Sequence, residues 1–409
     1  MRTVLISGAG IAGPTLAYWL KAAGFEPTLV ERAPVLRSGG YVIDFWGLGY
    51  DIAEQMGLLP DIDRSGYHVQ EMRVVDDRGR KLAGFGTRVF AELTGGRYVT
   101  LQRSDLSRLL FGKIKGRTEI LFGDEIVAVR EDPKCIRVEL EHAGERCFDL
   151  LIGADGIHSK VRQTLFPNEG APCWNGLMLW RGATDWPVFL TGQSMIIAGG
   201  LNAKAVIYPI AEGSSPASRL TNWAVLVRIG DANTAPPRRE DWSRLGKADE
   251  LMPHVNGFSI PQVDFAAMVR ATPEFWEYPC CDRDPLPYWS SGRVTLLGDA
   301  AHPMYPVGSN GASQAILDAR ALADALARSE HPRQALMTYE QKRLPMTADI
   351  VAANRRGGPE GVIDAVEQLA PQGFTDINTI LNYEAREGIV RGYASRAGFA
   401  ARMVTRQAS

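Results

Sequence analysis

The chain has 409 residues, of which 45% are hydrophobic, so it can bury a large core in two or three domains or in one domain with an inserted lobe. A formal net charge of -2 argues against nucleic acid or an anionic membrane surface as a partner. No apolar run reaches the ~18 residues that a spanning helix needs, and the amino terminus lacks a signal-peptide layout, so membrane insertion is not expected.

The cysteines and histidines predict neither a disulfide framework nor a metal site. The five cysteines are scattered, their odd number leaves at least one unpaired in a monomer, and the adjacent Cys280 and Cys281 are a poor pair for bonding to each other. A reduced, cytoplasmic setting is therefore expected. The six histidines lie far apart, with no HExxH or CxxC spacing.

The chain begins with a strand, a glycine-rich turn, a helix and a second strand. Residues 3–7 form the first apolar strand, a helix follows over about 11–23, and the run 28–30 ends at Glu31, which makes a βαβ unit of about thirty residues. The turn holds Gly8, Gly10 and Gly13 in the pattern G-x-G-x-x-G. These glycines allow a tight turn, close approach to a pyrophosphate and close helix–strand packing. A carboxylate at Glu31 suits ribose hydroxyls, which leaves NAD and the ADP half of FAD both open.

The middle of the chain predicts strands. A DDRG turn between extended flanks predicts a hairpin over 72–85, and Ser104 is a candidate cap for a helix that ends near Ile114. Alternating segments follow up to residue 142, and LLIGADG is a further strand that ends in glycine. From Trp174 to Arg228 short extended pieces alternate with turns, which predicts a mostly antiparallel sheet.

The carboxy-terminal part returns to a buried strand at residues 292–300, followed by two helices at about 311–328 and 333–354. The break at Gly357-Gly358-Pro359 precedes a helical tail, which could pack on the cofactor domain, cover the entrance or join a dimer. The expected fold is α/β: a Rossmann-like dinucleotide-binding domain with an inserted, mostly antiparallel β-sheet domain and C-terminal helices. The expected segments are 1–71, 98–170 and 287–365 for the dinucleotide-binding domain, 72–97 and 171–286 for the sheet domain, and 366–409 for the tail.

Two further motifs carry polar residues after strands. GADGIHSKVR runs from Gly153 to Arg162, and GDAAHPMYPVGSNGASQ runs from Gly298 to Gln314. With the first motif they resemble the three fingerprints of the FAD-dependent aromatic hydroxylases, which are single-component flavoprotein monooxygenases with the p-hydroxybenzoate hydroxylase fold. The segments LWRGAT, DRDPLPYW and MYPVGSNGASQAILD are most similar to phenazine hydroxylases.

The resemblance implies a set of FAD-contacting residues. An acid after the third-motif strand matches Asp299, and an arginine that opens the helix after the hairpin matches Arg103. Backbone N–H groups at the start of the helix after the third motif would face the flavin edge where negative charge accumulates. The implied cofactor-binding residues are Gly8, Gly10, Ala12, Gly13, Glu31, Arg32, Gly40, Arg103, Asp155, Asp299, Gly308, Asn310, Gly311 and Ala312.

Three residues of these motifs have structural alternatives. Asp155 is either linked to FAD and NAD(P)H use or a turn or N-cap residue of the helix after Gly156. Arg162 is expected in an ion pair or near the phosphates rather than as a catalyst. His302 is expected to pack or cap near the turn rather than to act as a base.

The resemblance implies that NADH or NADPH transiently reduces bound FAD, and that O₂ then forms a flavin C4a-hydroperoxide that hydroxylates an aromatic or polycyclic small molecule. No side chain is assigned as a certain catalyst, because the cofactor carries the chemistry, but Pro306 should lie near the site of oxygen transfer. Three alternatives stay open: an FAD-dependent reductase, a Baeyer–Villiger or drug-inactivating oxygenase, and a flavin-binding protein without turnover. The protein is expected as a monomer or homodimer.

The inserted sheet should form the roof of the substrate site. Aromatic residues in a sheet are usually core, so only a minority should touch substrate. Arg181 is either a partner for a substrate carboxylate or phenolate, or a surface or ion-pair residue. The substrate candidates are Trp46, Arg181, Tyr208, Trp223, Tyr305 and Pro306, with Trp180 and Met304 as further lining residues.

Overall fold

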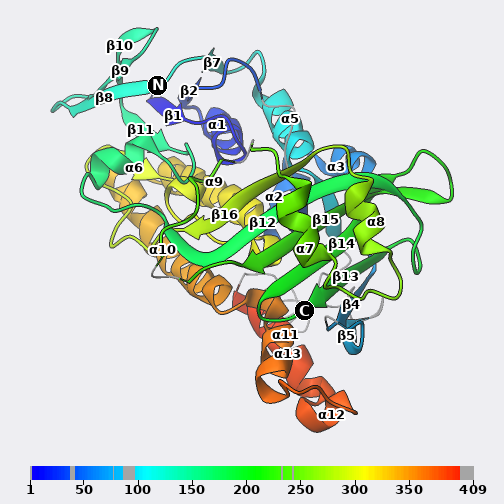
Figure 1. Cartoon of the computed structure of the whole chain (residues 1–409). Coiled ribbons are helices and arrows are strands. Elements are labelled where there is room, and N and C mark those ends of the chain that lie inside the picture. The colour runs from blue at the N-terminus through cyan, green and yellow to red at the C-terminus, as the bar shows by residue number, and fades with distance from the viewer. Residues whose placement is uncertain are drawn as a thin grey trace, which may run out of the picture.

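The computed structural model describes residues 2–36, 42–76, 78–85, 97–231, 234–241 and 244–396 (Figure 1). A five-stranded parallel sheet, in the order β17-β11-β1-β2-β7, forms the base of the nucleotide-binding part. Its strands are β1 (Thr3–Ser7), β2 (Glu26–Glu31), β7 (Glu119–Phe122), β11 (Leu150–Gly153) and β17 (Val294–Leu296). Its central strands are almost continuously apolar and buried, as expected for a parallel sheet covered on both faces.

Helices pack around this sheet in the arrangement predicted for a nucleotide-binding fold. The helix α1 (Ala12–Ala22) follows β1 and packs against α9 (Gly311–Ala327) and α5 (Arg103–Ile114), while α10 (Pro332–Arg355) packs on α9. The predicted cap at Ser104 is wrong, because α5 already begins at Arg103 and Gln102 occupies the cap position. Short helices α2 (Leu48–Gln55), α3 (Leu59–Ser65) and α6 (Lys160–Leu165) complete this part.

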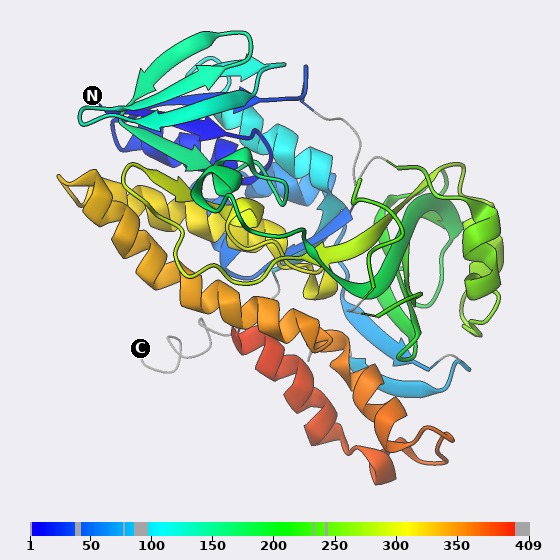
Figure 2. The same ribbon diagram turned by 60° about the vertical axis from the view of Figure 1, so that its left-hand side comes forward.

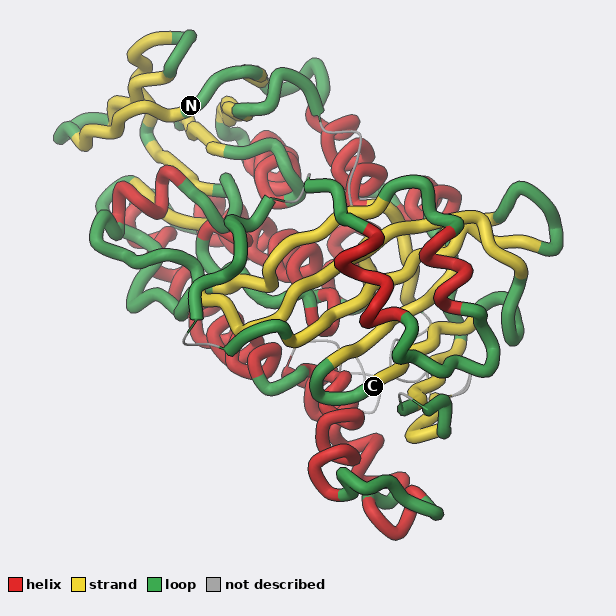
Figure 3. The backbone as a smooth tube through the Cα atoms, in the orientation of Figure 1, coloured by secondary structure: helices red, strands yellow, loops and turns green. Residues whose placement is uncertain are grey.

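A seven-stranded sheet forms the second layer, in the order β16-β12-β15-β14-β13-β4-β5. Neighbouring strands are antiparallel except for the parallel pair β13–β4, and the predicted hairpin at 72–85 is present as β4–β5. The strands are β4 (Glu71–Val75), β5 (Lys81–Phe85), β12 (Cys173–Pro187), β13 (Ser194–Gly199), β14 (Ala203–Glu212), β15 (Ser218–Arg228) and β16 (Phe275–Asp282). Two helices, α7 (Ala248–Val255) and α8 (Phe265–Arg270), cover one face of this sheet (Figure 3). The other face is available for a binding site.

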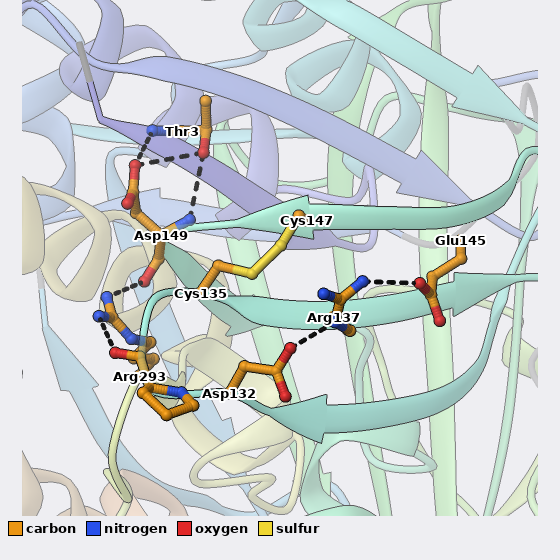
Figure 4. The surroundings of a disulfide bond; sticks show 9 residues. Thr3, Asp132, Cys135, Arg137, Glu145, Cys147, Asp149 and Arg293 are labelled. Atoms are coloured by element: carbon orange, nitrogen blue, oxygen red, sulfur yellow. Dashed lines mark hydrogen bonds and ion pairs between the residues drawn. A yellow bond between two sulfur atoms is a disulfide. The ribbon is translucent and has the colours of Figure 1, made fainter.

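Two small sheets are also present. The strands β3 (Val42–Trp46) and β6 (Tyr98–Gln102) pair antiparallel. The strands β8 (Ile126–Glu131), β9 (Ile136–Leu140) and β10 (Gly144–Phe148) form an antiparallel meander. Asp149 joins this meander to the parallel sheet, because its carboxylate accepts a 2.8 Å hydrogen bond from the Thr3 N–H (Figure 4).

A disulfide in the meander corrects one expectation from the sequence. Cys135, just before β9, is bonded to Cys147 on β10, so these two cysteines are not the free thiols that we expected (Figure 4). Cys173, Cys280 and Cys281 are free. Proximity decides the pairing: antiparallel neighbours bring the two Cα atoms to 6.0 Å, within the usual range for a disulfide. The cytoplasmic location therefore stays a prediction without the support of a fully reduced chain.

The carboxy-terminal helices pack against α10 and against the β4–β5 hairpin of the seven-stranded sheet. They comprise α11 (Gly361–Leu369), α12 (Ile377–Ile380) and α13 (Tyr383–Arg396), and α13 runs beside α10 (Figure 2). Tyr393 on α13 is buried, and its hydroxyl accepts a 2.6 Å hydrogen bond from Asn310 and lies 2.8 Å from the side-chain oxygen of Asn354. Three placements were considered for the tail. The structure shows that α13 packs on the cofactor domain, at the third motif.

Two further features are absent from the described ranges. No helix there combines the length and the apolar composition that crossing a bilayer demands. Nor do three or more histidine, cysteine or acidic side chains within those ranges gather as metal ligands would.

Candidate active site

One large cavity of about 1280 Å³ lies between the carboxyl ends of the parallel strands and the uncovered face of the seven-stranded sheet. Ligands of open α/β sheets bind outside the carboxyl ends of the strands, so the position is the expected one. The volume exceeds the ~300–1,000 Å³ typical of a site for a single small ligand. The cavity therefore has room for a dinucleotide and a second molecule.

The first motif builds one end of the cavity. Gly8, Gly10, Ala12, Glu31 and Arg32 all line it. The Glu31 carboxylate accepts hydrogen bonds of 2.9 Å from the N–H groups of two residues in neighbouring loops, Ala9 and Ala33. This bonding orders the glycine loop and leaves lone pairs on the carboxylate for a ligand hydroxyl.

Gly13 does not line the cavity and acts through packing. A Cβ atom at this position would lie 2.0 Å from the carbonyl oxygen of Gly8, so only glycine lets α1 start this close to β1. This contact is the close helix–strand packing expected of the third glycine in the motif.

Asp299 and Arg103 line the cavity next to the first motif. Asp299 follows β17 in the short helix η1 (Gly298–Ala300), and its side chain is exposed to the cavity. Removal of the carboxyl from bulk water raises the pKa of Asp299, and the negative charge of Asp318 adds to the rise. The charges of His302 and Arg103 oppose it. The Arg103 guanidinium reaches the backbone of Gly10, because a Cβ at Gly10 would lie 3.2 Å from its Nη2.

The second motif has a clear structural function. Asp155 accepts hydrogen bonds from the Ser159 hydroxyl and from the Lys160 N–H at 2.9 Å, and Ser159 caps α6 through the Arg162 N–H. Asp155 also lines the cavity, so capping and cofactor contact are compatible. Burial raises the pKa of Asp155, and these hydrogen bonds partly offset the rise.

Arg162 is an ion-pair residue, as the sequence analysis favoured. It is buried, pairs with Glu169, and donates hydrogen bonds of 3.0 and 2.9 Å to the carbonyl oxygens of Ala300 and Ala301. The second motif thereby holds the third motif in place, a link that is not evident from the sequence.

The third motif forms a turn along the cavity that leads into α9. Gly308, Asn310, Gly311 and Ala312 line the cavity, and Gly308 has a left-handed backbone with φ of +73°. Ser309 also has positive φ, at +50°, which is uncommon for a residue with a side chain. The first turn of α9 leaves backbone N–H groups without partners inside the helix, so this end of the cavity favours negative charge.

His302 lies behind this turn and is absent from the cavity wall. It is buried and bonds to Asp318 of α9, whose carboxylate also accepts from the Arg343 Nε at 2.6 Å and from the Gly298 N–H at 3.1 Å. His302 therefore packs near the turn, as expected. Asp318 was not predicted from the sequence, because an acid in a helix gives no sign that it faces inward.

The roof of the cavity follows the alternation of strand side chains. Leu179 and Arg181 of β12 and Tyr208 of β14 face the cavity. Trp180 and Trp223 point to the opposite face, beneath α7 and α8, where Trp223 is fully buried and donates a 2.8 Å hydrogen bond to Thr272. The prediction that these two tryptophans line the substrate site is corrected, because neighbouring residues in a strand point to opposite faces.

The other substrate candidates are all in the cavity wall, and their contact with a substrate stays a prediction. Trp46, Arg181, Tyr208, Met304, Tyr305 and Pro306 line the cavity. The Arg181 guanidinium lies 4.6 Å from the centre of the Tyr278 ring, which is within range of a cation–π contact. Among the acids of the wall that the sequence did not indicate are Asp44 and Glu360. Gly40 lies outside the described residues.

The residues at the nucleotide end fit FAD. The glycine loop allows close backbone approach, and Asp299 presents a carboxyl toward the cavity. The side-chain oxygen of Asn310 is buried and has no hydrogen-bond partner among the described residues. These features supply hydrogen-bond donors and acceptors along the cavity wall from the glycine loop of the first motif to the turn of the third motif.

Comparisons with known proteins agree with this geometry. The chain matches the FAD binding domain family over residues 1–247 and 284–354. It is 34% identical over 366 residues to a phenazine 1,6-dicarboxylic acid hydroxylase of Lysobacter antibioticus, covering 86% of this chain and 89% of the relative. It is 32% identical over 367 residues to a 3-amino-4-hydroxybenzoate 2-monooxygenase of Streptomyces platensis, covering 87% and 88%.

A solved structure supports the fold. Klebsiella pneumoniae HpxO, complexed with FAD and uric acid, superposes with a TM-score of 0.79 at 23% identity, covering 97% of this chain and 96% of that one. The predicted fold class, the FAD cofactor and the similarity to phenazine hydroxylases are confirmed. The chain belongs to the FAD binding domain family, and it is an FAD-dependent monooxygenase.

Proposed function

We propose that this monooxygenase uses NADH or NADPH and O₂ to hydroxylate an aromatic or polycyclic small molecule inside the cavity. The observation that carries the proposal is the continuity of the cavity, whose wall runs from Gly8 and Glu31, past the turn at Pro306, to Tyr208 and Arg181 of the roof. Such a wall lets one molecule of FAD and one ring substrate meet at the turn. The two relatives named above act on a phenazine dicarboxylic acid and an aminohydroxybenzoate, which are both aromatic acids.

Bound FAD supplies electron transfer and oxygen activation, so the side chains need only bind, orient and exclude water. In the proposal, Gly8, Gly10 and Glu31 hold the nucleotide end, and Asp299 and Arg103 hold the middle of the cofactor. The residues Gly308, Asn310, Gly311 and Ala312 run along the ring. Arg181 binds an anionic group of the substrate, and Pro306 lies where oxygen is transferred. Cytoplasmic location and the choice between monomer and homodimer stay predictions.

The test is a substrate screen with purified holoprotein. NADH and NADPH oxidation is followed with phenazine-1,6-dicarboxylate, 3-amino-4-hydroxybenzoate and related rings, under ¹⁸O₂, with product mass as the second readout. We expect ring-stimulated oxidation of one of the two nucleotides and a product that gains a single labelled oxygen in a new hydroxyl group. Saturation of a double bond without O₂ would indicate a reductase, insertion beside a ketone would indicate a Baeyer–Villiger enzyme, and no turnover would indicate a flavin-binding protein.

We expect the Asp299→Ala variant to retain FAD poorly, because it removes the carboxyl that faces the middle of the cavity. Loss of a charged hydrogen bond of ~1.5–3 kcal/mol would raise the Kd for FAD roughly tenfold to a hundredfold. Fluorescence titration of apoprotein with FAD measures the change. The control is Asp105→Ala, which removes an acid of α5 that pairs with Arg108 outside the cavity wall. Equal FAD affinity in the two variants would refute the role of Asp299.

A further inference from the structure

The carboxyl of Asp44 occupies a position in the cavity wall that the proposed function does not yet use. The strand β3 alternates in burial: Ile43 and Phe45 belong to the main core, whereas Val42, Asp44 and Trp46 are less buried. All of these residues except Phe45 line the cavity. An acid is disfavoured in a strand, and placing a carboxyl among apolar walls costs free energy unless it gains partners. Its position therefore requires an explanation.

One partner belongs to the turn of the third motif. The Ser309 hydroxyl donates a 2.5 Å hydrogen bond to Oδ2 of Asp44. Ser309 is the residue with a φ of +50°, so this bond helps to hold an unfavourable backbone conformation beside the proposed flavin site. Asp44 thus lies beside the turn that would run along the flavin, and it also lines the cavity that would hold the substrate.

The bond to Ser309 does not use the full capacity of the carboxyl. An ionised carboxylate has about four lone-pair positions, and Ser309 occupies one of them. Oδ1 is buried and makes no hydrogen bond of standard geometry to any residue in the described ranges. Burial raises the pKa of Asp44, and the hydroxyl groups of Ser309, Tyr98 and Tyr208 oppose the rise. The hydroxyl groups of Tyr98 and Tyr208 also lie within reach of the carboxyl, so its surroundings in the cavity wall are already polar.

The surroundings of Asp44 define a polar axis across the substrate end. Tyr208 lies close enough to both Asp44 and Arg181 for each charge to act on its hydroxyl, with opposite effects on its pKa. A second acid, Glu360, also lines the cavity and interacts electrostatically with Asp44. A ring that spans this region would meet a hydrogen-bond acceptor at Asp44 and a cation at Arg181.

We propose that Asp44 is a specificity-determining residue, which accepts a hydrogen bond from an N–H or O–H group on the substrate ring while Arg181 binds an anionic substituent. The substrate class is therefore an amino- or hydroxy-substituted aromatic acid. This inference rests on the proposed hydroxylation, because it assigns the substrate of the same cavity.

Matched ligand pairs test this assignment. The holoenzyme is titrated with 3-hydroxybenzoate against 3-methoxybenzoate, and with 3-amino-4-hydroxybenzoate against 3-(dimethylamino)-4-methoxybenzoate, using the visible spectrum of bound FAD as the readout. In the unaltered protein we expect the donor-bearing member to bind about tenfold more tightly or better, because a methylated ring would leave the Asp44 carboxyl without a donor. In Asp44→Asn we expect the ratio within each pair to fall below about threefold.

Two control variants separate binding from structure. Ser309→Ala removes the anchoring bond but keeps the carboxyl, and Glu360→Gln removes another acid of the cavity wall, one that interacts electrostatically with Asp44. Both should keep the preference for the donor-bearing ring. Loss of the preference in either control to the same extent as in Asp44→Asn would overturn the assignment to Asp44.

Further binding and turnover results would overturn the role of Asp44 or separate it from the proposed function. Equal binding within each pair by the unaltered protein overturns the proposal whether or not Asp44→Asn folds, and so does failure of every donor-bearing ring to bind. Failure of the proposed function has a different signature, because the ring then binds with the donor preference while the product contains no oxygen from O₂. Hydroxylation of the methylated rings with equal kcat/KM refutes only the role of Asp44.

Discussion

We expect the Gly13→Ala variant to lose tightly bound FAD and to unfold at lower temperature than the unaltered protein. The added Cβ would lie 2.0 Å from the carbonyl oxygen of Gly8 and 3.4 Å from a methyl group of Ile6. The closest atom belongs to the backbone, so no side-chain rotation relieves the clash. The start of α1 must move away from β1, which displaces the glycine loop that lines the cavity. Overpacking of this kind costs ~1–3 kcal/mol of stability.

The matched control is Gly112→Ala. Gly112 lies within α5, has no positive φ, and has nothing within 4 Å of the position of an added Cβ. Alanine in a helix interior is favoured over glycine by ~0.5–1 kcal/mol, so this variant should keep FAD and be equally or slightly more stable. The flavin-to-protein absorbance ratio after gel filtration and the melting temperature are compared. Retention of a full complement of FAD by Gly13→Ala would show that the helix start can shift without harm.

Replacing Asp318 by Asn should cause the largest loss of stability among the single substitutions considered. Asp318 is completely buried, and its carboxylate is the shared partner of Arg343, His302 and the Gly298 N–H. Removing its charge leaves the Arg343 guanidinium buried without a counterion. Breaking a buried pair in this way costs ~3–5 kcal/mol. The free energy of unfolding in urea at pH 7 measures the effect.

The same substitution should also change the acid limb of the stability profile. Burial raises the pKa of Asp318, but the charges and hydrogen bonds of His302 and Arg343 outweigh it, so its pKa lies below the ordinary value. Its contribution is therefore fully present above the unfolded pKa of ~4 and is lost as pH falls through the lower native value. Asp318→Asn should lose less stability on acidification than the unaltered protein.

A second acid on the same helix provides the control. Asp324 pairs with Arg320 at 3.0 Å, and both side chains are about one-third exposed. Exposed pairs contribute ~0–1 kcal/mol, so Asp324→Asn should unfold nearly as the unaltered protein does. Equal destabilisation by the two variants would indicate that helix position, rather than the buried ion network, determines the loss.

Local patterns predicted much of the architecture. The period of two in the chain after Trp174 and the continuous apolar runs at residues 3–7 and 292–300 are set by short-range sterics and burial, so the two kinds of sheet were predictable. The wrong predictions for two tryptophans also follow from the use of local patterns alone. Trp180 and Trp223 are aromatic like Tyr208, and composition does not tell which face of a strand meets a cavity rather than α7 and α8.

The sequence by itself determined the α/β fold class and the three motifs in their order, because each depends on residue types at short spacing. The FAD cofactor and the class of reaction followed from the resemblance of these motifs to those of the FAD-dependent aromatic hydroxylases. Only the tertiary structure decided which side chains share the cavity. Asp44 and Ser309 are far apart in the chain, as are Arg162 and Ala300, yet each pair is joined by a hydrogen bond. Such partners are selected by packing between layers, because burial of one polar group is tolerated only where another element supplies its hydrogen bond.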